Sequence, residues 1–383
     1  MRVGILAIVI CLLTSVPASA VPQRQVLFDG GSSYPRVIRL HDGTILSSLT
    51  TNDGTQGVGV ISVSTDQGQT FRKLATVADP AAGNSAGICC STLYELPSPV
   101  GTLPAGTVLW ASTSGYAIAG DERRTRQRLW ASTDRGATWK FLSDIGVAAN
   151  QYATWEPSLS VAADGQLVAF YSDETDKLRH DQKLVQVRSS DGLKWTDYRE
   201  TVVSDVWEVR PGMINAIRLP GGDYFMTYEV CNNDKVHLCS AYFRRSKDGW
   251  DYGDPRDLGV LIMTADRKRG RHTPVPAWSP GPGPNGTILV ITEMLVRDGG
   301  ALAPGNGGTI LANDNRGEGA WYEIPAPVPV SGVDNEGCRN FSPALLPSTD
   351  GLSVLEVTTD YDQGVCKTFY GIGPLVRSGR KES

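Results

Sequence analysis

Two glutamates stand out as residues that could do acid–base or nucleophilic chemistry. Glu156 lies in the segment TWEP and Glu229 in MTYEV, so both have apolar and aromatic neighbours. A partly apolar setting can raise the pKa of one carboxyl while a nearby carboxyl stays ionised, and such a pair can share acid and nucleophile roles. The alternative is structural, with either glutamate forming an ion pair with Arg210 or Arg339.

Such a pair needs elements that bring the two glutamates together, and an internal repeat indicates what these elements are. The segment STDQGQTF at 64–71 returns as STDRGATW at 132–139, SSDGLKW at 189–195 and, more weakly, SKDGW at 246–250. In each copy the aspartate can bond nearby backbone N–H groups and the glycine can take a positive φ. We therefore interpret these aspartates as turn-formers, namely Asp66, Asp134, Asp191 and Asp248.

A second repeat has a period of about 60 residues and joins two apolar strands through a glycine turn. It occurs six times, with turn glycines at Gly43, Gly106, Gly165, Gly222, Gly286 and Gly351. Each unit has room for four strands, which is typical of a propeller blade. The predicted fold is all-β, a six-bladed β-propeller of four-stranded antiparallel blades, closed by a strand near 25–28 beside the last blade.

In a propeller, the starts of the innermost strands and the ends of the second strands share one face. Glu156 in the third blade and Glu229 in the fourth are then neighbours. Acids, arginines and aromatic rings at one cavity mouth suit a sugar, because carboxylates can cleave it, rings stack on it and arginines bond its hydroxyls. The candidate substrate-binding residues are Tyr34, Arg36, Asp53, Trp155, Asp173, Trp207, Arg210, His272, Arg339 and Tyr361.

The N-terminus and the charge bear on where the protein works. Residues 1–20 combine Arg2, a short apolar run and the sequence ASA, which is typical of a secretory signal peptide. We expect residues 21–383 to form one exported, monomeric domain. The 383 residues include 36 Lys and Arg against 41 Asp and Glu, a net charge of −5. This balance disfavours nucleic acid and membranes as partners.

Six cysteines remain once Cys11 leaves with the signal peptide, and an oxidising compartment favours disulfides. Six cysteines allow 15 pairings. The expected bridges are Cys231–Cys239 across a hairpin, Cys338–Cys366 and the vicinal pair Cys89–Cys90. Neither a metal nor a cofactor is expected, because the chain has no CxxC motif and its four histidines are scattered.

Several segments resemble those of glycoside hydrolase family 93, the exo-α-1,5-L-arabinanases, within the sialidase-like propellers in the broad sense. They are YPR at 34–36, HDG at 41–43, CCSTLYELP at 89–97, WEP at 155–157, FYSD at 170–173, RPGM at 210–213, YE at 228–229 and FSPAL at 341–345. Their shared order along nearly the whole mature chain carries the resemblance. It implies a secreted retaining enzyme that removes arabinobiose from the non-reducing end of linear arabinan. Its catalytic pair falls on Glu156, for which we expect the nucleophile role, and Glu229, the general acid/base.

Two other functions compete with this interpretation. An exo-α-sialidase needs a tyrosine nucleophile and an arginine triad, but Phe341 stands where the sialidase tyrosine opens the last blade. The start of the first blade also departs from the sialidase pattern, with YPRV at 34–37. A non-catalytic glycan-binding propeller is the second alternative, since one fold hosts many functions. A lectin tends to repeat its binding residues, whereas the residues on this face differ from blade to blade.

Overall fold

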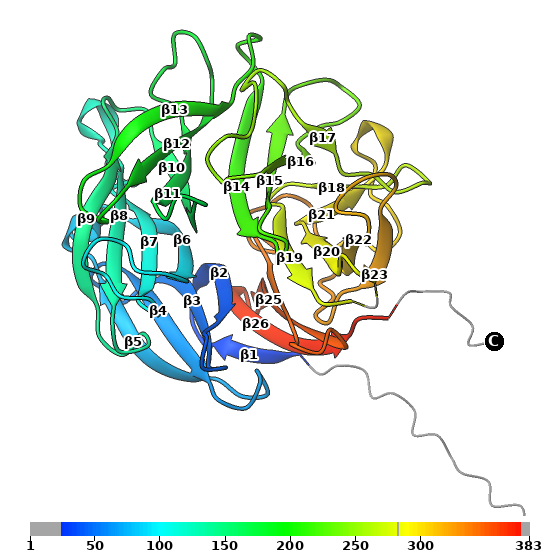
Figure 1. Cartoon of the computed structure of the whole chain (residues 1–383), viewed down its shortest axis with the longest axis horizontal. Helices are drawn as coiled ribbons and strands as arrows, with labels where there is room; N and C mark the ends of the chain where they lie inside the picture. Colours follow the sequence, from blue (N-terminus) through cyan, green and yellow to red (C-terminus); the bar gives the residue numbers. More distant parts are fainter. Residues whose placement is uncertain (1–23, 282, 377–383) are drawn as a thin grey trace, which may run out of the picture.

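The structure, a computed structural model, describes residues 24–281 and 283–376, so the predicted signal peptide at 1–20 lies outside the described residues. Six antiparallel sheets surround a common centre (Figure 1). The helical elements within the described ranges are short 3-10 turns, at Pro80–Ala82, Gly120–Glu122 and Asp298–Gly300. No helix in this part of the chain is long and apolar enough to cross a membrane. The sheets confirm the predicted six-bladed, all-β propeller.

Each blade runs outward from an innermost strand, in chain order. Blade one holds β2 (Ser32–Arg39), β3 (Ile45–Asn52), β4 (Gly57–Ser64) and β5 (Arg72–Ala78). Blade two holds β6 (Ile88–Glu95), β7 (Val108–Ser114), β8 (Arg126–Ser132) and β9 (Lys140–Val147). Blade three holds β10 (Thr154–Val161), β11 (Leu167–Asp173), β12 (Lys183–Ser189) and β13 (Thr196–Val202).

The second half of the propeller follows the same plan with one elaboration. Blade four holds β14 (Arg210–Arg218), β15 (Tyr224–Cys231), β16 (Ser240–Ser246) and the short β17 (Val260–Leu261). Its β16 also pairs with β18 (Arg269–Arg271), which pairs in turn with β21 (Met294–Val296). Blade five holds β19 (Val275–Ser279), β20 (Thr287–Ile291), β22 (Thr309–Asn313) and β23 (Tyr322–Pro325). Because β17 is so short, the edge of β16 is free to accept β18.

The last blade closes the ring with a strand from the other end of the chain. Its strands are β24 (Ala344–Pro347), β25 (Ser353–Asp362), β26 (Val365–Pro374) and β1 (Gln25–Phe28). The β1 strand is antiparallel to β26, with Gln25 opposite Tyr370, and the two lie side by side as blue and red ribbons in Figure 1. This pairing confirms the predicted closing strand.

The repeated aspartates hold the turns between third and fourth strands. In blade one Asp66 accepts hydrogen bonds from the Thr70 backbone N–H (3.0 Å) and from Ser64 Oγ (2.7 Å). Gly68 of this turn has a φ of 86°, and its counterpart in blade two, Gly136, has a φ of 88°. A fifth turn, in blade five, uses Asn313 in place of the serine, and its Oδ1 accepts from the Gly317 N–H at 2.9 Å. The sequence repeat missed this copy because Asn313 replaces the serine.

Neighbouring blades pack through apolar side chains that alternate along the strands. Trp110 of β7 is fully buried and packs against Leu46 and Ile61 of blade one. Gly59 makes this contact possible, because a Cβ there would lie 2.4 Å from the Trp110 ring. A side chain at position 59 would therefore push the two blades apart.

The innermost strands of blades one to four share a bulge at the face where they begin. The register shifts once in each of β2, β6, β10 and β14. The first residue of each bulge has a positive φ, at Tyr34 (57°), Cys90 (62°), Glu156 (56°) and Met213 (56°). A positive φ is uncommon for a residue other than glycine, and bulges often re-aim side chains near active sites. Tyr34, Cys90 and Met213 meet in one cluster, so the bulges direct side chains toward the centre.

All three expected disulfides are present. The bonds are Cys231–Cys239, Cys338–Cys366 and the vicinal pair Cys89–Cys90. Each of them ties a segment on the face where the innermost strands begin. The disulfides therefore stabilise the loops of the face that carries the two glutamates.

Candidate active site

A cavity of about 370 Å³ lies on this face, between blades two, three and four. It is lined by Cys90, Trp155, Glu156, Glu174, Gln182, Arg210, Met213, Glu229 and Cys231. Both candidate glutamates are among these residues. The propeller thus brings together two carboxyls that are far apart in the chain, because blades three and four are neighbours.

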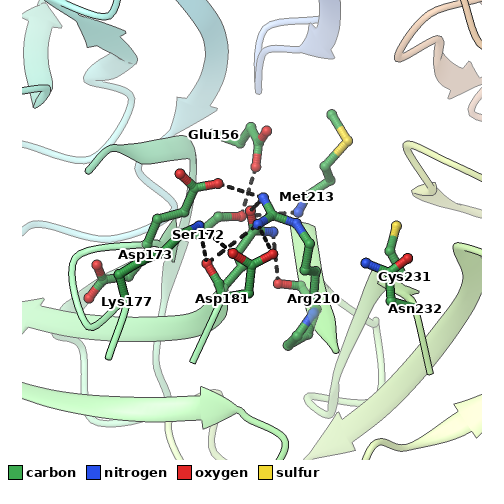
Figure 2. Close-up of polar contacts among 12 residues, drawn as sticks. Glu156, Ser172, Asp173, Lys177, Asp181, Arg210, Met213, Cys231 and Asn232 are labelled. Atoms are coloured by element: carbon green, nitrogen blue, oxygen red, sulfur yellow. Dashed lines mark hydrogen bonds and ion pairs between the residues drawn. The ribbon is translucent and has the colours of Figure 1, made fainter. Parts of the chain in front are cut away.

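Glu156 sits at the bulge of β10 and is held by a short chain of hydrogen bonds. The Met213 backbone N–H donates to Ser172 Oγ at 3.2 Å, and the Ser172 hydroxyl donates to Glu156 Oε2 at 2.7 Å (Figure 2). The Glu156 N–H donates to Thr113 Oγ1 at 3.2 Å. Burial raises the pKa of Glu156 to about 7, against the opposing effect of Ser172, and the charge of Glu229 raises it further. The Ser172 contact therefore fixes Oε2 of a side chain that lines the cavity.

Glu229 lies near the end of β15 and is also nearly buried. Its Oε2 accepts a hydrogen bond from the Thr273 backbone N–H at 2.9 Å and lies 3.3 Å from His272 Nδ1. Its Oε1 lies 3.6 Å from the Sγ of Cys231. Glu229 therefore has a titratable imidazole as a direct neighbour, whereas the contacts of Glu156 are a hydroxyl and backbone groups.

The structural alternative for the two glutamates, an ion pair with Arg210 or Arg339, is wrong. Arg210 forms ion pairs with Glu174 and Asp181, at 2.5 Å each. Figure 2 shows its guanidinium beside Asp181, below the Glu156 carboxylate. Arg339 pairs with Glu336 at 2.8 Å. Within the described ranges, neither Glu156 nor Glu229 is ion-paired with an arginine.

The aromatic candidates divide between the cavity wall and the layer behind it. Trp155 lines the cavity, next to Glu156. Tyr34 is buried behind it, packed with Cys90, and its ring meets Phe341 edge-on at 6.0 Å. Trp207 is exposed outside the cavity lining, and its Nε1 donates to the Lys177 carbonyl at 2.9 Å. Of the three predicted sugar platforms, Trp155 alone borders this cavity.

Two polar residues that were predicted to bind substrate form hydrogen bonds within the protein instead. Arg36 is buried and donates to the Ser342 carbonyl and hydroxyl, at 3.0 Å each. Asp173 accepts from the Tyr198 hydroxyl at 2.6 Å and from the Thr175 hydroxyl at 2.7 Å. Both terminal nitrogens of Arg36 and both carboxylate oxygens of Asp173 therefore already have partners within the protein, whereas Arg36 Nε is buried without one.

Of the other predicted contacts, Arg210 lines the cavity, whereas Asp53, Arg339, Tyr361 and His272 lie outside the lining. Asp53 caps an exposed turn, where its Oδ1 accepts from the N–H groups of Thr55 and Gln56. Arg339 lies with its guanidinium over the ring of Tyr361, at 5.2 Å, next to a second cavity. His272 contacts Glu229, and Arg210 belongs to the wall of the cavity that holds both glutamates.

Ser172 and Thr273 contact the two candidate glutamates, and the sequence prediction did not include them. The segment FYSD at 170–173 was recognised, but the aspartate was chosen as the polar contact. Successive side chains of a strand point to opposite faces, so Ser172 and Asp173 cannot both face the cavity. The pairing of Trp155 with Ser172 in the register of β10 and β11 would have selected the serine.

Replacing Ser172 tests the support of Glu156. In Ser172→Ala the pKa of Glu156 rises, because the hydroxyl that lowers it is lost. We expect kcat/KM to fall about tenfold, in line with a lost hydrogen bond to a charged group, and the acidic limb of the pH profile to move to higher pH. Ser172→Thr keeps the hydroxyl and should restore the profile. An unchanged acidic limb in Ser172→Ala would contradict this role.

Comparisons with solved structures find propellers that are similar to nearly the whole chain. A scan against sequence-family models finds no match, and a search of curated proteins finds none either. Among solved structures, an α-L-arabinanase of Penicillium chrysogenum complexed with arabinobiose is similar, with 26% identity, a TM-score of 0.77 and coverage of 94% of this chain and 99% of that one. The GH93 α-L-arabinofuranosidase of Fusarium graminearum, also complexed with arabinobiose, has 25% identity, a TM-score of 0.75 and coverage of 93% and 99%.

The chain resembles glycoside hydrolase family 93. Its likeness to these enzymes extends over the whole propeller, as the shared order of the sequence segments predicted. The NanB sialidase of Streptococcus pneumoniae also matches, at 11% identity and a TM-score of 0.58, with 94% of this chain and 71% of that one covered. That likeness shows the sialidase-type propeller fold and nothing about the reaction.

Proposed function

We propose that this protein is a secreted, retaining, exo-acting glycoside hydrolase that releases arabinobiose from the non-reducing end of linear α-1,5-L-arabinan. The observation that supports this most is the pair Glu156 and Glu229 in one cavity, on a fold similar to GH93 enzymes solved with arabinobiose. The predicted signal peptide and the three disulfides fit secretion. The substrate is neutral, so the site needs no cationic group to bind it.

In the proposed mechanism Glu156 is the nucleophile and Glu229 the general acid/base. Glu229 gives its proton to the glycosidic oxygen while Glu156 Oε1 bonds to the anomeric carbon, and the shortened arabinan leaves. Glu229 then removes a proton from water, which displaces Glu156 and releases arabinobiose with its configuration retained. The hydroxyl of Ser172 holds Oε2 of Glu156, whose side chain lines the cavity. His272 lies beside Glu229, which donates a proton in the first step and accepts one in the second.

The pKa of Glu156 predicts how the reaction depends on pH. As the nucleophile, Glu156 must be ionised, and burial raises its pKa to about 7. We therefore expect kcat/KM to fall about tenfold per pH unit as the pH drops below this value, since kcat/KM reports ionisations of the free enzyme. A profile of kcat/KM from pH 4 to pH 9 tests this. An activity that is instead lost as the pH rises through 7 would favour the reverse assignment, with Glu156 as the general acid.

The identity of the released sugar tests the function. Purified protein is incubated with linear arabinan, with sialyl-lactose and with buffer, and the products are separated by chromatography. We expect arabinobiose from arabinan and nothing from the other two. Sialic acid from sialyl-lactose would replace this function by a sialidase, and no product from either substrate would favour a glycan-binding propeller.

One set of contacts weighs against the sialidase. A sialidase binds the substrate carboxylate with three free arginines. Here the candidates Arg36, Arg210 and Arg339 all have partners of their own, in Ser342, in Glu174 and Asp181, and in Glu336. Binding a carboxylate with them would require these contacts to break.

A further inference from the structure

A second cavity, of about 350 Å³, opens on the same face between blades six, one and two. We call it the outer groove. Its lining consists of Gly31, Ser32, Ser33, Thr50, Thr51, Asn52, Gly57, Gly87, Ile88, Tyr116, Glu336, Gly337, Cys338, Tyr361 and Cys366. Neither catalytic glutamate belongs to this lining. Of the ten residues predicted to bind substrate, Tyr361 lies here rather than in the catalytic cavity.

Two tyrosines from different blades line the outer groove. Tyr116 follows β7 in blade two, and Tyr361 lies in β25 of blade six. Each has 37% of its surface exposed, and neither hydroxyl has a hydrogen-bond partner among the described residues. Exposed rings that carry a free hydroxyl can stack on a sugar and also bond it. The ring of Tyr361 is held in place by Arg339, which lies over it at 5.2 Å.

The remaining polar groups of the outer groove are mostly uncharged. Ser33 and Thr50 contribute hydroxyls, which lie 3.3 Å apart. Asn52 accepts a backbone hydrogen bond with its Oδ1, so its amide NH₂ group is available to a ligand. The acid Glu336 is neutralised by Arg339. Neutral donors and acceptors beside aromatic rings match an uncharged sugar rather than an anion.

The outer groove lies next to the catalytic cavity, and the two share a wall. Ile88 lines the groove and Cys90 lines the catalytic cavity, and they are two residues apart on β6. The Tyr116 ring lies 6.1 Å from the ring of Trp155, which borders the catalytic cavity. The vicinal disulfide and this aromatic pair therefore form the divide between the two cavities.

We propose that the outer groove binds further arabinose residues of the same arabinan chain, on the leaving side of the bond that is cleaved. This inference rests on the proposed function. An enzyme that removes two residues from the non-reducing end leaves a single long part of the substrate, which is the leaving part. That part extends past Trp155 and Tyr116 into the outer groove, where Tyr116 and Tyr361 contact its sugar rings.

The dependence of the rate on substrate length tests the proposal without any mutation. We expect wild-type kcat/KM to rise about tenfold from arabinotriose to arabinohexaose, as added sugars reach the outer groove. A value that stays flat across these lengths would overturn the proposal. If neither substrate is cleaved, the proposed function fails as well, whereas cleavage of both with equal efficiency overturns the outer groove alone.

Variants then assign the effect to the two tyrosines. In Tyr116→Ala and Tyr361→Ala, kcat/KM on arabinohexaose should fall about three- to tenfold, and the loss on arabinotriose should be clearly smaller. Tyr116→Phe and Tyr361→Phe keep the ring and should recover most of the loss. Leu352→Ala, at an exposed site in the turn between β24 and β25, is the matched control. Equal losses on both substrates, or no loss on arabinohexaose, would refute the assignment.

Discussion

Glu156→Ala should lose nearly all hydrolysis of arabinan, with kcat/KM falling on the order of 10⁴-fold, because nucleophile losses in covalent mechanisms are of this size or larger. The variant keeps the cavity and removes the carboxylate that attacks the anomeric carbon. Added azide should then restore cleavage of an activated aryl arabinobioside. Since azide attacks in place of Glu156, the product is the arabinobiosyl azide with inverted configuration.

The controls separate this result from damage to the fold. Glu156→Gln keeps the shape and should be as inactive on arabinan. Glu318→Gln changes an exposed glutamate on the far rim of blade five and should retain wild-type activity. Circular dichroism of all three variants checks the fold. Azide rescue of Glu156→Ala that gives the retained azide would assign the nucleophile role to Glu229 instead.

Glu229→Ala should show a loss that depends on the leaving group. On arabinan, whose leaving oxygen needs a proton, we expect kcat/KM to fall about 10³-fold, within the usual range for general acid catalysis. On an aryl arabinobioside with an acidic phenol the first step needs no proton, so the glycosyl-enzyme forms and accumulates. Azide should then speed its breakdown and yield the product with retained configuration.

The leaving-group dependence is the measurement that decides this prediction. The rates of Glu229→Ala are compared across aryl arabinobiosides whose phenols differ in pKa, and the wild-type enzyme serves as the reference. We expect a steep dependence in the variant and a shallow one in the wild type. Glu229→Gln keeps an acceptor for the Thr273 N–H and should behave like the alanine variant. A variant that loses equal activity on all these substrates would show that Glu229 does not protonate the leaving group.

Much of the fold could be predicted because its signals are local. Turn glycines such as Gly43 and Gly106 recur once per blade, and the aspartate turns depend on hydrogen bonds within a few residues, as Asp66 shows. Consecutive blades are adjacent in a propeller, so counting them also placed Glu156 beside Glu229. The Asn313 turn was missed because a different side chain makes the same local bond.

The partners of the polar side chains could not be predicted in this way. Arg36 is held by Ser342, which is 306 residues away in the chain, and Arg210 by Glu174 and Asp181. From the sequence alone, Arg36 and Arg210 are equally good candidates for binding a sugar. Their availability depends on which acids and carbonyls the folded loops bring within reach, and that contact is made across blades.

The number of blades, the closing strand and the two glutamates of one cavity could be read from the chain, because each follows from a repeated local pattern or from the order of the blades. Which other side chains reach that cavity depends on contacts that form on folding. The bulge that gives Glu156 its positive φ shifts the alternation of β10, so that Trp155 lies opposite Ser172 and the Ser172 hydroxyl reaches Glu156. One residue of register moves a side chain to the other face of a sheet, and the composition of a strand does not show where this shift occurs.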